Sequence, residues 1–269
     1  MTAGALGRSW ALASILVAAT LIFLARTERW IDREALGRPV VVIGSSLLLH
    51  AVPASLPEKG GLLGDGRGHT RVAIQQISEE QTLSLLSQAM EAGAGTIFVE
   101  ANSLAFDFAH RRPPWILQAS MGLAQRAYDL RRPIRWLLGR EASLGREEAQ
   151  SLDATSVIEP EALKISHPLH LREPRQPGRL AGILQEARDR GVEIVLVVPP
   201  RAQTAADHMG AEAQQTLQAH LAALAGNWGL PLFAPAPAWP DSYFVDHAHM
   251  NAQGRARFLA EIAQWWHDR

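Results

Sequence analysis

Short runs of apolar, mainly β-branched residues alternate along this chain with segments of helical periodicity. The run Pro39–Gly44 reads Pro-Val-Val-Val-Ile-Gly, and its lack of polar alternation is typical of a strand buried on both faces of a parallel sheet. Similar runs occur at Arg71–Ile77, Thr96–Glu100, Val192–Val198 and, in shorter form, Leu230–Phe233. Because parallel strands need long crossovers, usually helices, this alternation constrains the chain to an α/β fold.

Helical signals fill the intervals between the strands and the end of the chain. The predicted helices are Glu79–Ala92, Gly178–Arg190, Ala211–Ala225 and Ala252–His267. The first follows a capping box at Ser78–Gln81, and the next two are expected to end at Gly191 and Gly226. We therefore expect a three-layer α/β/α fold with a parallel sheet of roughly five strands, covered by helices on both faces.

The composition narrows the classes of protein to which the chain can belong. With 269 residues, 47% of them apolar and 20% charged, it is long enough for a large domain with a proper core, and disorder is excluded. The formal net charge of −1 argues against nucleic acid as the main partner, because phosphate binding needs a strong basic excess. The absence of cysteine excludes disulfides, a thiolate nucleophile and a cysteine-based metal site.

An uncharged apolar stretch, Ser9–Ala25, lies near the start of the chain between Arg8 and Arg26. At about 1.5 Å per residue it is at the short end of what spans a bilayer core of roughly 30 Å. The alternatives are a cleaved signal peptide, although no clear cleavage site follows, and a buried helix, although a polar face is missing. We predict a membrane anchor at residues 1–30 and one catalytic domain at residues 31–269. Because arginines lie on both sides, the positive-inside rule leaves the orientation open.

One connection, at about residues 103–177, is too long for a simple loop. Its first half, Phe108–Arg140, mixes tryptophans and leucines with seven arginines. That mixture is typical of an amphipathic helical insertion on a membrane surface or a partner protein, and equally of an ordinary pair of surface helices. The second half, Glu141–Pro177, is rich in proline, serine and charge, and we expect a loop that can cover a site.

Reactive side chains follow the predicted strands at the edge of the sheet where ligands gather, at the carboxyl ends of parallel strands. Ser46 follows the first strand, Asn102 the third, and Asp246 and His249 precede the last helix. A serine nucleophile needs a general base, commonly histidine, and that histidine needs a carboxylate. The spacing of Asp246 and His249 lets one turn point both side chains into one cleft. An asparagine amide can stabilise a tetrahedral oxyanion.

A metal site is the rival interpretation of Asp246, His247 and His249, since imidazoles and a carboxylate are good zinc or iron ligands. The remaining histidines are scattered along the chain and form no second ligand cluster. His50 follows Ser46 by one helical turn and is expected near the site rather than in it. We expect neither a metal nor a cofactor.

The ordered set of serine, asparagine, aspartate and histidine resembles the SGNH, or GDSL-type, hydrolase superfamily over roughly Pro39 to Trp266. Gly44-Ser45-Ser46 resembles the first block, with Ser46 as the nucleophile and Ser45 in place of the usual aspartate, as in envelope acyltransferase branches. The most specific match is the last block, Asp246-His-Ala-His-Met-Asn251, with Gly254 in the next turn.

Two further positions of the resemblance concern the oxyanion hole. Asn102 resembles the oxyanion asparagine of the third block. The family usually has a glycine after the second strand, whereas here Ser78 takes that position at the start of a helix. A backbone N–H at a helix N-terminus can donate to an anion, so Ser78 is the predicted second donor.

The resemblance implies a flavodoxin-like sheet and acyl chemistry on oxygen, with Ser46 as nucleophile, His249 as base and Asp246 as its orienting partner. Together with the anchor, it implies a single-pass protein of the inner (cytoplasmic) membrane whose catalytic domain lies in the periplasm. Such a protein moves acetyl groups onto or off a cell-envelope polysaccharide and works with a membrane-bound O-acyltransferase. The alternatives are a carbohydrate or lipid esterase without a partner, and a catalytically idle accessory subunit of a polysaccharide complex.

Overall fold

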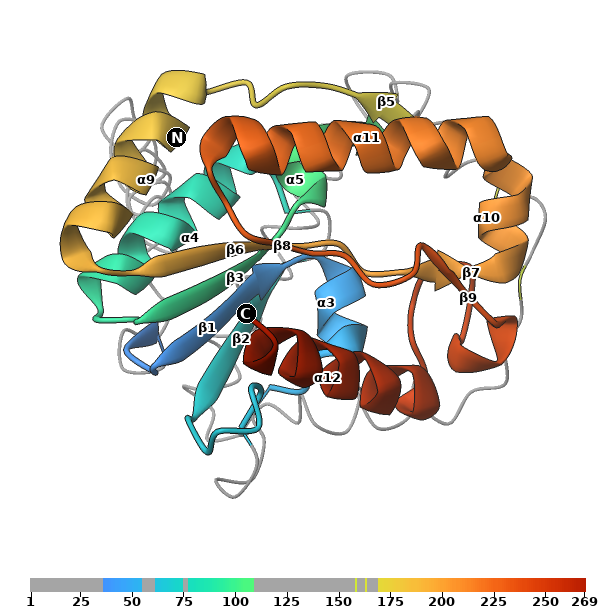
Figure 1. The fold of residues 1–269 in the computed structure, drawn as a ribbon, viewed down its shortest axis with the longest axis horizontal. Helices are drawn as coiled ribbons and strands as arrows, with labels where there is room; N and C mark the ends of the chain where they lie inside the picture. Colours follow the sequence, from blue (N-terminus) through green and yellow to red (C-terminus); the bar gives the residue numbers. More distant parts are fainter. Residues whose placement is uncertain (1–35, 55–60, 75–76, 109–157, 159–162, 164–168) are drawn as a thin grey trace, which may run out of the picture. The chain divides into compact units, whose positions relative to one another are not determined.

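A parallel five-stranded sheet forms the centre of the fold (Figure 1). The computed structural model describes residues 36–54, 61–74, 77–108, 158, 163 and 169–269. The sheet consists of β2 (His69–Ala73), β1 (Val40–Gly44), β3 (Thr96–Glu100), β6 (Glu193–Val197) and β8 (Leu232–Phe233), in that spatial order. Strands β1 and β3 are buried along their whole length, as expected for continuous apolar runs covered on both faces.

Helices cover both faces of this sheet and make the fold three-layered (Figure 1). The helices α4 (Glu79–Glu91), α9 (Pro177–Arg190) and α11 (Ala211–Trp228) lie on one face, and α3 (Ser46–Ala51) and α12 (Ala252–His267) lie on the other. Phe258 and Ile262 of α12 are fully buried and join a core that includes Phe98, Phe233 and Trp239. The predicted three-layer arrangement is confirmed.

The order of the strands places a topological switch point beside β1. Numbered within the sheet, the order is 2-1-3-4-5, the doubly wound order of flavodoxin-like folds. The chain leaves β1 toward β2 on one side and returns to β3 on the other, and both are paired with β1 in parallel. In such sheets, ligands bind in the crevice outside the carboxyl ends of the two strands where the order reverses, which here are β1 and β3.

The largest differences from the predicted boundaries are in β2 and α11, whereas the other predicted elements agree within one or two residues. Strand β2 covers His69–Ala73 rather than 71–77, since its register begins with His69 opposite Val40. Helix α11 continues past Gly226 to Trp228 and ends at Gly229 in the left-handed region. There the N–H of Leu230 donates to Ala225 O, a Schellman motif that closes the helix three residues later than predicted.

Several short elements carry too little periodicity to be predicted from the sequence. They are α5 (Asn102–Ala105), β4 (Phe106–Phe108), β5 (Leu169–Leu171), β7 (Arg201–Ala202), α10 (Gln203–Met209), β9 (Ala238–Trp239) and the 3-10 turn η1 (Asp241–Tyr243). Strands β4 and β5 pair antiparallel and bring the two described ends of the predicted insertion together. Apart from Phe108, the predicted amphipathic part of that insertion, Phe108–Arg140, lies outside the described residues.

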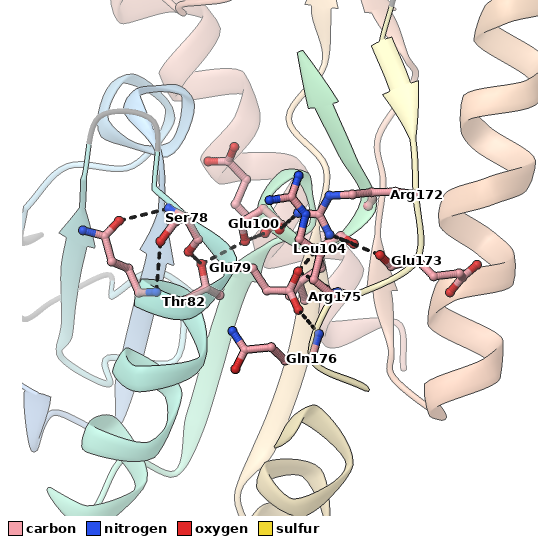
Figure 2. A network of polar contacts seen from close by, with 12 residues as sticks. Ser78, Glu79, Thr82, Glu100, Leu104, Arg172, Glu173, Arg175 and Gln176 are labelled. Atoms are coloured by element: carbon pink, nitrogen blue, oxygen red, sulfur yellow. Dashed lines mark hydrogen bonds and ion pairs between the residues drawn. The ribbon is translucent and has the colours of Figure 1, made fainter. Parts of the chain in front are cut away.

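A buried ion pair fastens the chain where it returns from the insertion (Figure 2). Arg172 Nη1 donates to Glu79 Oε2 over 2.8 Å, and Arg172 Nη2 donates to the carbonyl oxygen of Ser103 over 2.7 Å. Glu79 also accepts the backbone N–H groups of Arg175 and Gln176. The network therefore ties the segment between β5 and α9 to the first turn of α4 and to α5, directly beside Asn102.

The predicted membrane anchor at residues 1–30 lies outside the described residues. Among the residues that the structure describes, no helix is both long and apolar enough to cross a membrane.

Candidate active site

The candidate site lies at the carboxyl ends of β1 and β3, where the loop before α12 meets them. Ser46 is the first residue of α3, which begins directly after β1. Ser45 is its N-cap, and its hydroxyl accepts the Leu47 N–H over 3.2 Å. Gly44 is required here because an added Cβ would lie 2.6 Å from Leu48 Cδ1 and 2.8 Å from Glu100 Oε2.

A continuous hydrogen-bonded chain links Ser46, His249 and Asp246. His249 Nε2 lies 2.9 Å from Ser46 Oγ, and His249 Nδ1 lies 2.7 Å from Asp246 Oδ2. Because an ionised carboxylate only accepts, Nδ1 carries the proton and donates to Asp246. In the neutral ring, Nε2 then carries no proton and accepts from the Ser46 hydroxyl. The structure thus brings together the three side chains that the sequence singles out as a nucleophile, its base and an orienting carboxylate.

The loop that carries Asp246 is folded around the carboxylate itself. Asp246 Oδ1 accepts the backbone N–H groups of Ala248 and His249, each over 2.8 Å. Burial opposes ionisation, but these bonds, led by the one from the His249 ring, outweigh it and hold the Asp246 pKa well below its ordinary range. The carboxylate therefore stays charged at neutral pH and fixes the tautomer of His249.

The segment around this loop is closed by backbone contacts. The Val245 N–H donates to His249 O over 2.8 Å, and the Asn251 N–H donates to Tyr243 O over 3.0 Å. Asn251 then caps α12 by accepting the Gly254 N–H over 3.0 Å. Gly254 is needed because an added Cβ would lie 2.1 Å from the Tyr243 carbonyl oxygen. These contacts explain why an Asp-x-x-His sequence is followed by asparagine and glycine.

Two arginines bind the other end of α3. Arg71 Nη1 donates to the carbonyl oxygens of Leu49 and Val52, and Arg255 Nε donates to that of His50. These bonds satisfy carbonyl groups that a helix end leaves without intrahelical donors. Because α3 has only six residues, they also hold the turn on which Ser46 stands.

Asn102 lies at the start of α5 with only 8% of its surface exposed. Its Nδ2 donates to Glu100 Oε1 over 2.6 Å. The same carboxylate accepts the backbone N–H of Ser45 over 2.7 Å. Asn102 and the residue next to Ser46 are therefore held by one side chain, which places the predicted oxyanion asparagine beside the nucleophile turn.

Ser78 is exposed and caps α4. Its hydroxyl accepts the Gln81 N–H, and its own N–H donates to Gln81 Oε1 over 3.0 Å. The capping box that the sequence predicts is therefore confirmed. The same box engages the N–H that was predicted to bind an oxyanion. That role for Ser78 stays a prediction without geometric support, because the donor already has an acceptor.

Glu100 is the residue of this site that the sequence analysis missed. It ends β3 with 1% of its surface exposed. Burial raises the Glu100 pKa, although the hydrogen bonds from Ser45 and Asn102 act in the opposite direction. Burial lowers the pKa of Arg201, which lies on β7, to about 10. The nearby Glu100 opposes this shift, because its negative charge favours the charged guanidinium. The available signal was a carboxylate at the end of an otherwise apolar strand, because a buried charge needs partners.

The residues of the rival metal interpretation are arranged differently from a metal centre. Within the described part of the chain, no three His, Asp or Glu side chains are grouped so that they could hold one ion. His249 uses both ring nitrogens toward Ser46 and Asp246. The backbone carbonyl of His247 accepts the Ala202 N–H over 3.3 Å, which joins this loop to β7.

Comparisons with known proteins give a distant structural likeness. No family model matches the chain, and no curated protein matches it. Among solved structures, the chain is similar to a GDSL-like lipase from Bacteroides thetaiotaomicron, with a TM-score of 0.45 and 12% sequence identity. The similar region covers 91% of this chain and 98% of that one. The chemistry of the site therefore has to follow from its own geometry.

Proposed function

We propose that this protein is an SGNH-type serine esterase or acyltransferase, with Ser46 as nucleophile, His249 as general base and Asp246 as the carboxylate that orients the base. The observation that carries the proposal is the hydrogen-bonded chain from Ser46 Oγ through the His249 ring to Asp246. Its placement at the switch point of a doubly wound sheet supports the same conclusion.

The first half of the reaction forms an acyl-enzyme. Ser46 Oγ attacks the carbonyl carbon of an ester while its proton moves to His249 Nε2. Asp246 stabilises the imidazolium that results. The negative charge on the carbonyl oxygen is met by the Ser46 N–H and by an amide N–H of Asn102. His249 then protonates the leaving alcohol, and the acyl group remains on Ser46.

The second half of the reaction transfers the acyl group to a hydroxyl. His249 removes a proton from water or from an acceptor alcohol, which attacks the acyl carbon. As the ester bond to Ser46 breaks, His249 returns this proton to Ser46 Oγ. Water gives hydrolysis, whereas a sugar hydroxyl gives transfer. Because water is present at about 55 M, a transferase has to position its acceptor or exclude solvent.

Within this proposal, the substrate is an O-acetyl group of a cell-envelope polysaccharide. The support is sequence-based: the Gly-Ser-Ser form of the first block resembles envelope acyltransferases, and the apolar stretch Ser9–Ala25 suits a membrane anchor. An anchored enzyme of this kind works in the periplasm beside a membrane-bound O-acyltransferase that supplies acetyl groups.

Hydrolysis of p-nitrophenyl acetate tests the serine mechanism. We expect turnover by the wild type, and a fall of about 10³-fold or more in kcat for Ser46→Ala. The matched control is Ser87→Ala on α4, where the lost hydroxyl donates only to the Leu83 carbonyl and activity should be unchanged. Equal kcat in wild type and Ser46→Ala would contradict the proposal. Wild-type inactivity would instead favour the idle accessory subunit.

Adding acceptors to the same assay separates the two reaction types. Acetylated polysaccharide formed from p-nitrophenyl acetate in the presence of a soluble glucan, mannuronan or cellulose oligomer would identify a transferase. Release of acetate alone, at a rate that the glycan does not change, would identify an esterase.

A further inference from the structure

Glu100 is a buried carboxylate to which the reaction just described assigns no step. It stands at the end of β3, and β1 and β3 run in parallel with Ile43 opposite Val99, so its side chain faces the end of β1. The space there is shaped for it, because a Cβ on Gly44 would come within 2.8 Å of Glu100 Oε2. Only glycine, which has no side chain, lets the Glu100 carboxylate lie this close to the end of β1.

Both oxygens of Glu100 accept hydrogen bonds from the turns that flank the candidate site. Oε2 accepts the Ser45 backbone N–H over 2.7 Å, and the Ser45 hydroxyl lies within 2.9 Å of both oxygens. Oε1 accepts from Asn102 Nδ2 over 2.6 Å. One side chain therefore joins the β1–α3 turn, which carries Ser46, to the β3–α5 turn, which carries Asn102.

The bond to Asn102 settles which way round its amide lies. In the structure the NH2 end of the amide faces Glu100, as an ionised carboxylate requires, and the amide oxygen faces away. One N–H is used by Glu100. Because the amide is planar, this bond also fixes the direction of the second Asn102 N–H. In the proposed mechanism this second N–H binds the oxyanion.

We propose that Glu100 is the positioning residue of this site, and that it fixes the Asn102 amide and the Ser45 turn so that the Asn102 N–H and the Ser46 N–H converge on the oxyanion. The inference rests on the proposed serine mechanism. Glu100 touches no reacting atom in this scheme, and it acts through Asn102 and Ser45.

Glu100→Gln is the most direct test, because glutamine keeps the shape but replaces one acceptor oxygen with a donor. In either orientation its NH2 group faces a donor, Asn102 Nδ2 or the Ser45 N–H. The conflict is relieved when the Asn102 amide turns round. We expect kcat for p-nitrophenyl acetate to fall about 10- to 100-fold with KM within about twofold, since a misplaced donor weakens mainly the transition state.

Glu79→Gln is the matched control for loss of a buried, multiply bonded carboxylate. Glu79 also accepts two backbone N–H groups and an arginine side chain, but these donors lie in the β5–α9 segment, and neither Ser45 nor Asn102 is among them (Figure 2). We expect both variants to lower the melting temperature and only Glu100→Gln to lower kcat. Equal effects of the two variants on kcat would show that Glu100 is merely structural.

A double-mutant cycle with Asn102→Ala identifies the route of the effect. If Glu100 acts through the asparagine amide, the loss of kcat in Glu100→Gln/Asn102→Ala stays within about threefold of that in Asn102→Ala alone. Losses that multiply would overturn the proposal, as would a Glu100→Gln enzyme with wild-type kcat. If the wild type shows no Ser46-dependent turnover, the proposed serine mechanism is wrong. This outcome differs from failure of the Glu100 proposal, in which the wild type is active and Glu100→Gln keeps the wild-type kcat.

Ser45→Ala keeps the proposal testable if Glu100→Gln does not fold. This variant removes the hydroxyl bonds to Glu100 together with the cap bond from the Leu47 N–H, and it keeps the Ser45 backbone N–H that donates to Glu100. We expect a smaller fall in kcat, about 3- to 10-fold, again with little change in KM. A wild-type kcat in folded Ser45→Ala would count against Glu100 as the holder of this turn.

Discussion

His50 packs against His249, with the two ring centroids 4.7 Å apart and the ring planes inclined by 49°. His50 stands on α3, four residues after Ser46, so the helix that carries the proposed nucleophile also carries a ring that packs against the proposed base. Burial, helped by His249 and Arg255, lowers the His50 pKa to about 4, although Asp246 and the Met250 backbone oppose the shift. His50 is therefore neutral at physiological pH and adds no positive charge beside His249.

His50 makes the stability of the protein depend on pH in a defined window. An unfolded histidine has a pKa of about 6.5, so between that value and about 4 the unfolded state binds a proton that the folded state does not. The contribution of neutral His50 is complete above pH 6.5 and is lost as the pH falls toward 4. We expect the melting temperature of the wild type to fall by a few degrees more between pH 7 and pH 4.5 than that of His50→Phe.

Thermal unfolding of both proteins at the two pH values measures this difference. Phenylalanine keeps a flat ring beside His249 and removes the titration. Parallel curves of melting temperature against pH for wild type and His50→Phe would contradict this prediction, because they would mean that His50 has the same pKa in the folded and unfolded protein.

Asp246→Asn tests the tautomer of His249. The asparagine oxygen can still accept the backbone N–H groups of Ala248 and His249, so the loop should keep its shape. Its NH2 group now donates to His249 Nδ1, which therefore carries no proton. The ring proton then lies on Nε2, so His249 can no longer accept the proton of Ser46. We expect kcat to fall about 10³- to 10⁴-fold in the p-nitrophenyl acetate assay, with a small change in melting temperature. A kcat within tenfold of the wild type would contradict the assigned role.

Gly254→Ala tests the close approach that supports the histidine loop. An added Cβ would overlap the Tyr243 carbonyl oxygen, and the backbone would have to move apart. We expect the free energy of unfolding to fall by about 3 kcal/mol, measured by urea denaturation, and esterase activity to fall with it. Gly182→Ala on α9 is the control, since nothing lies within 4 Å of its added Cβ and helix propensity should raise stability by up to about 1 kcal/mol. Similar effects of the two substitutions would refute this explanation of Gly254.

Arg172→Met tests the buried pair that closes the insertion. Arg172 and Glu79 have only 17% and 4% of their side chains exposed, so removing the cation leaves a buried carboxylate without its ionic partner. We expect a loss of about 3 kcal/mol in the free energy of unfolding. In Arg190→Met, which breaks the exposed i,i+4 pair with Glu186, the loss should stay below about 1 kcal/mol. A loss in Arg172→Met as small as in Arg190→Met would show that the pair carries little stability.

The regular elements of this fold could be predicted because their signals are local. Continuous apolar runs marked β1, β3 and β6 within a residue or two, and the capping box at Ser78 marked the start of α4. The end of α11 was misplaced because two glycines, at 226 and 229, both suit a helix end. The backbone conformation distinguishes them: the helix continues through Gly226 and ends where Gly229 adopts the left-handed conformation and the Leu230 N–H donates to Ala225 O.

The candidate site could be predicted in part. The residues of the triad follow from their types and their positions after predicted strands, whereas Glu100 was passed over as one more residue of a strand. The role of Glu100 appears only when β1 and β3 are neighbours, because Ser45 and Asn102, which both donate to it, lie on two different turns.

The sequence by itself determined where strands and helices form and which residues have the chemistry for acyl transfer, since periodicity, caps and side-chain type are properties of short segments. Only the tertiary structure decided that Ser46 and His249, 203 positions apart, lie within hydrogen-bond distance. It also decided that one buried carboxylate holds both turns. Such contacts depend on the order of strands in the sheet, which results from the burial of the whole core and is encoded in no single segment.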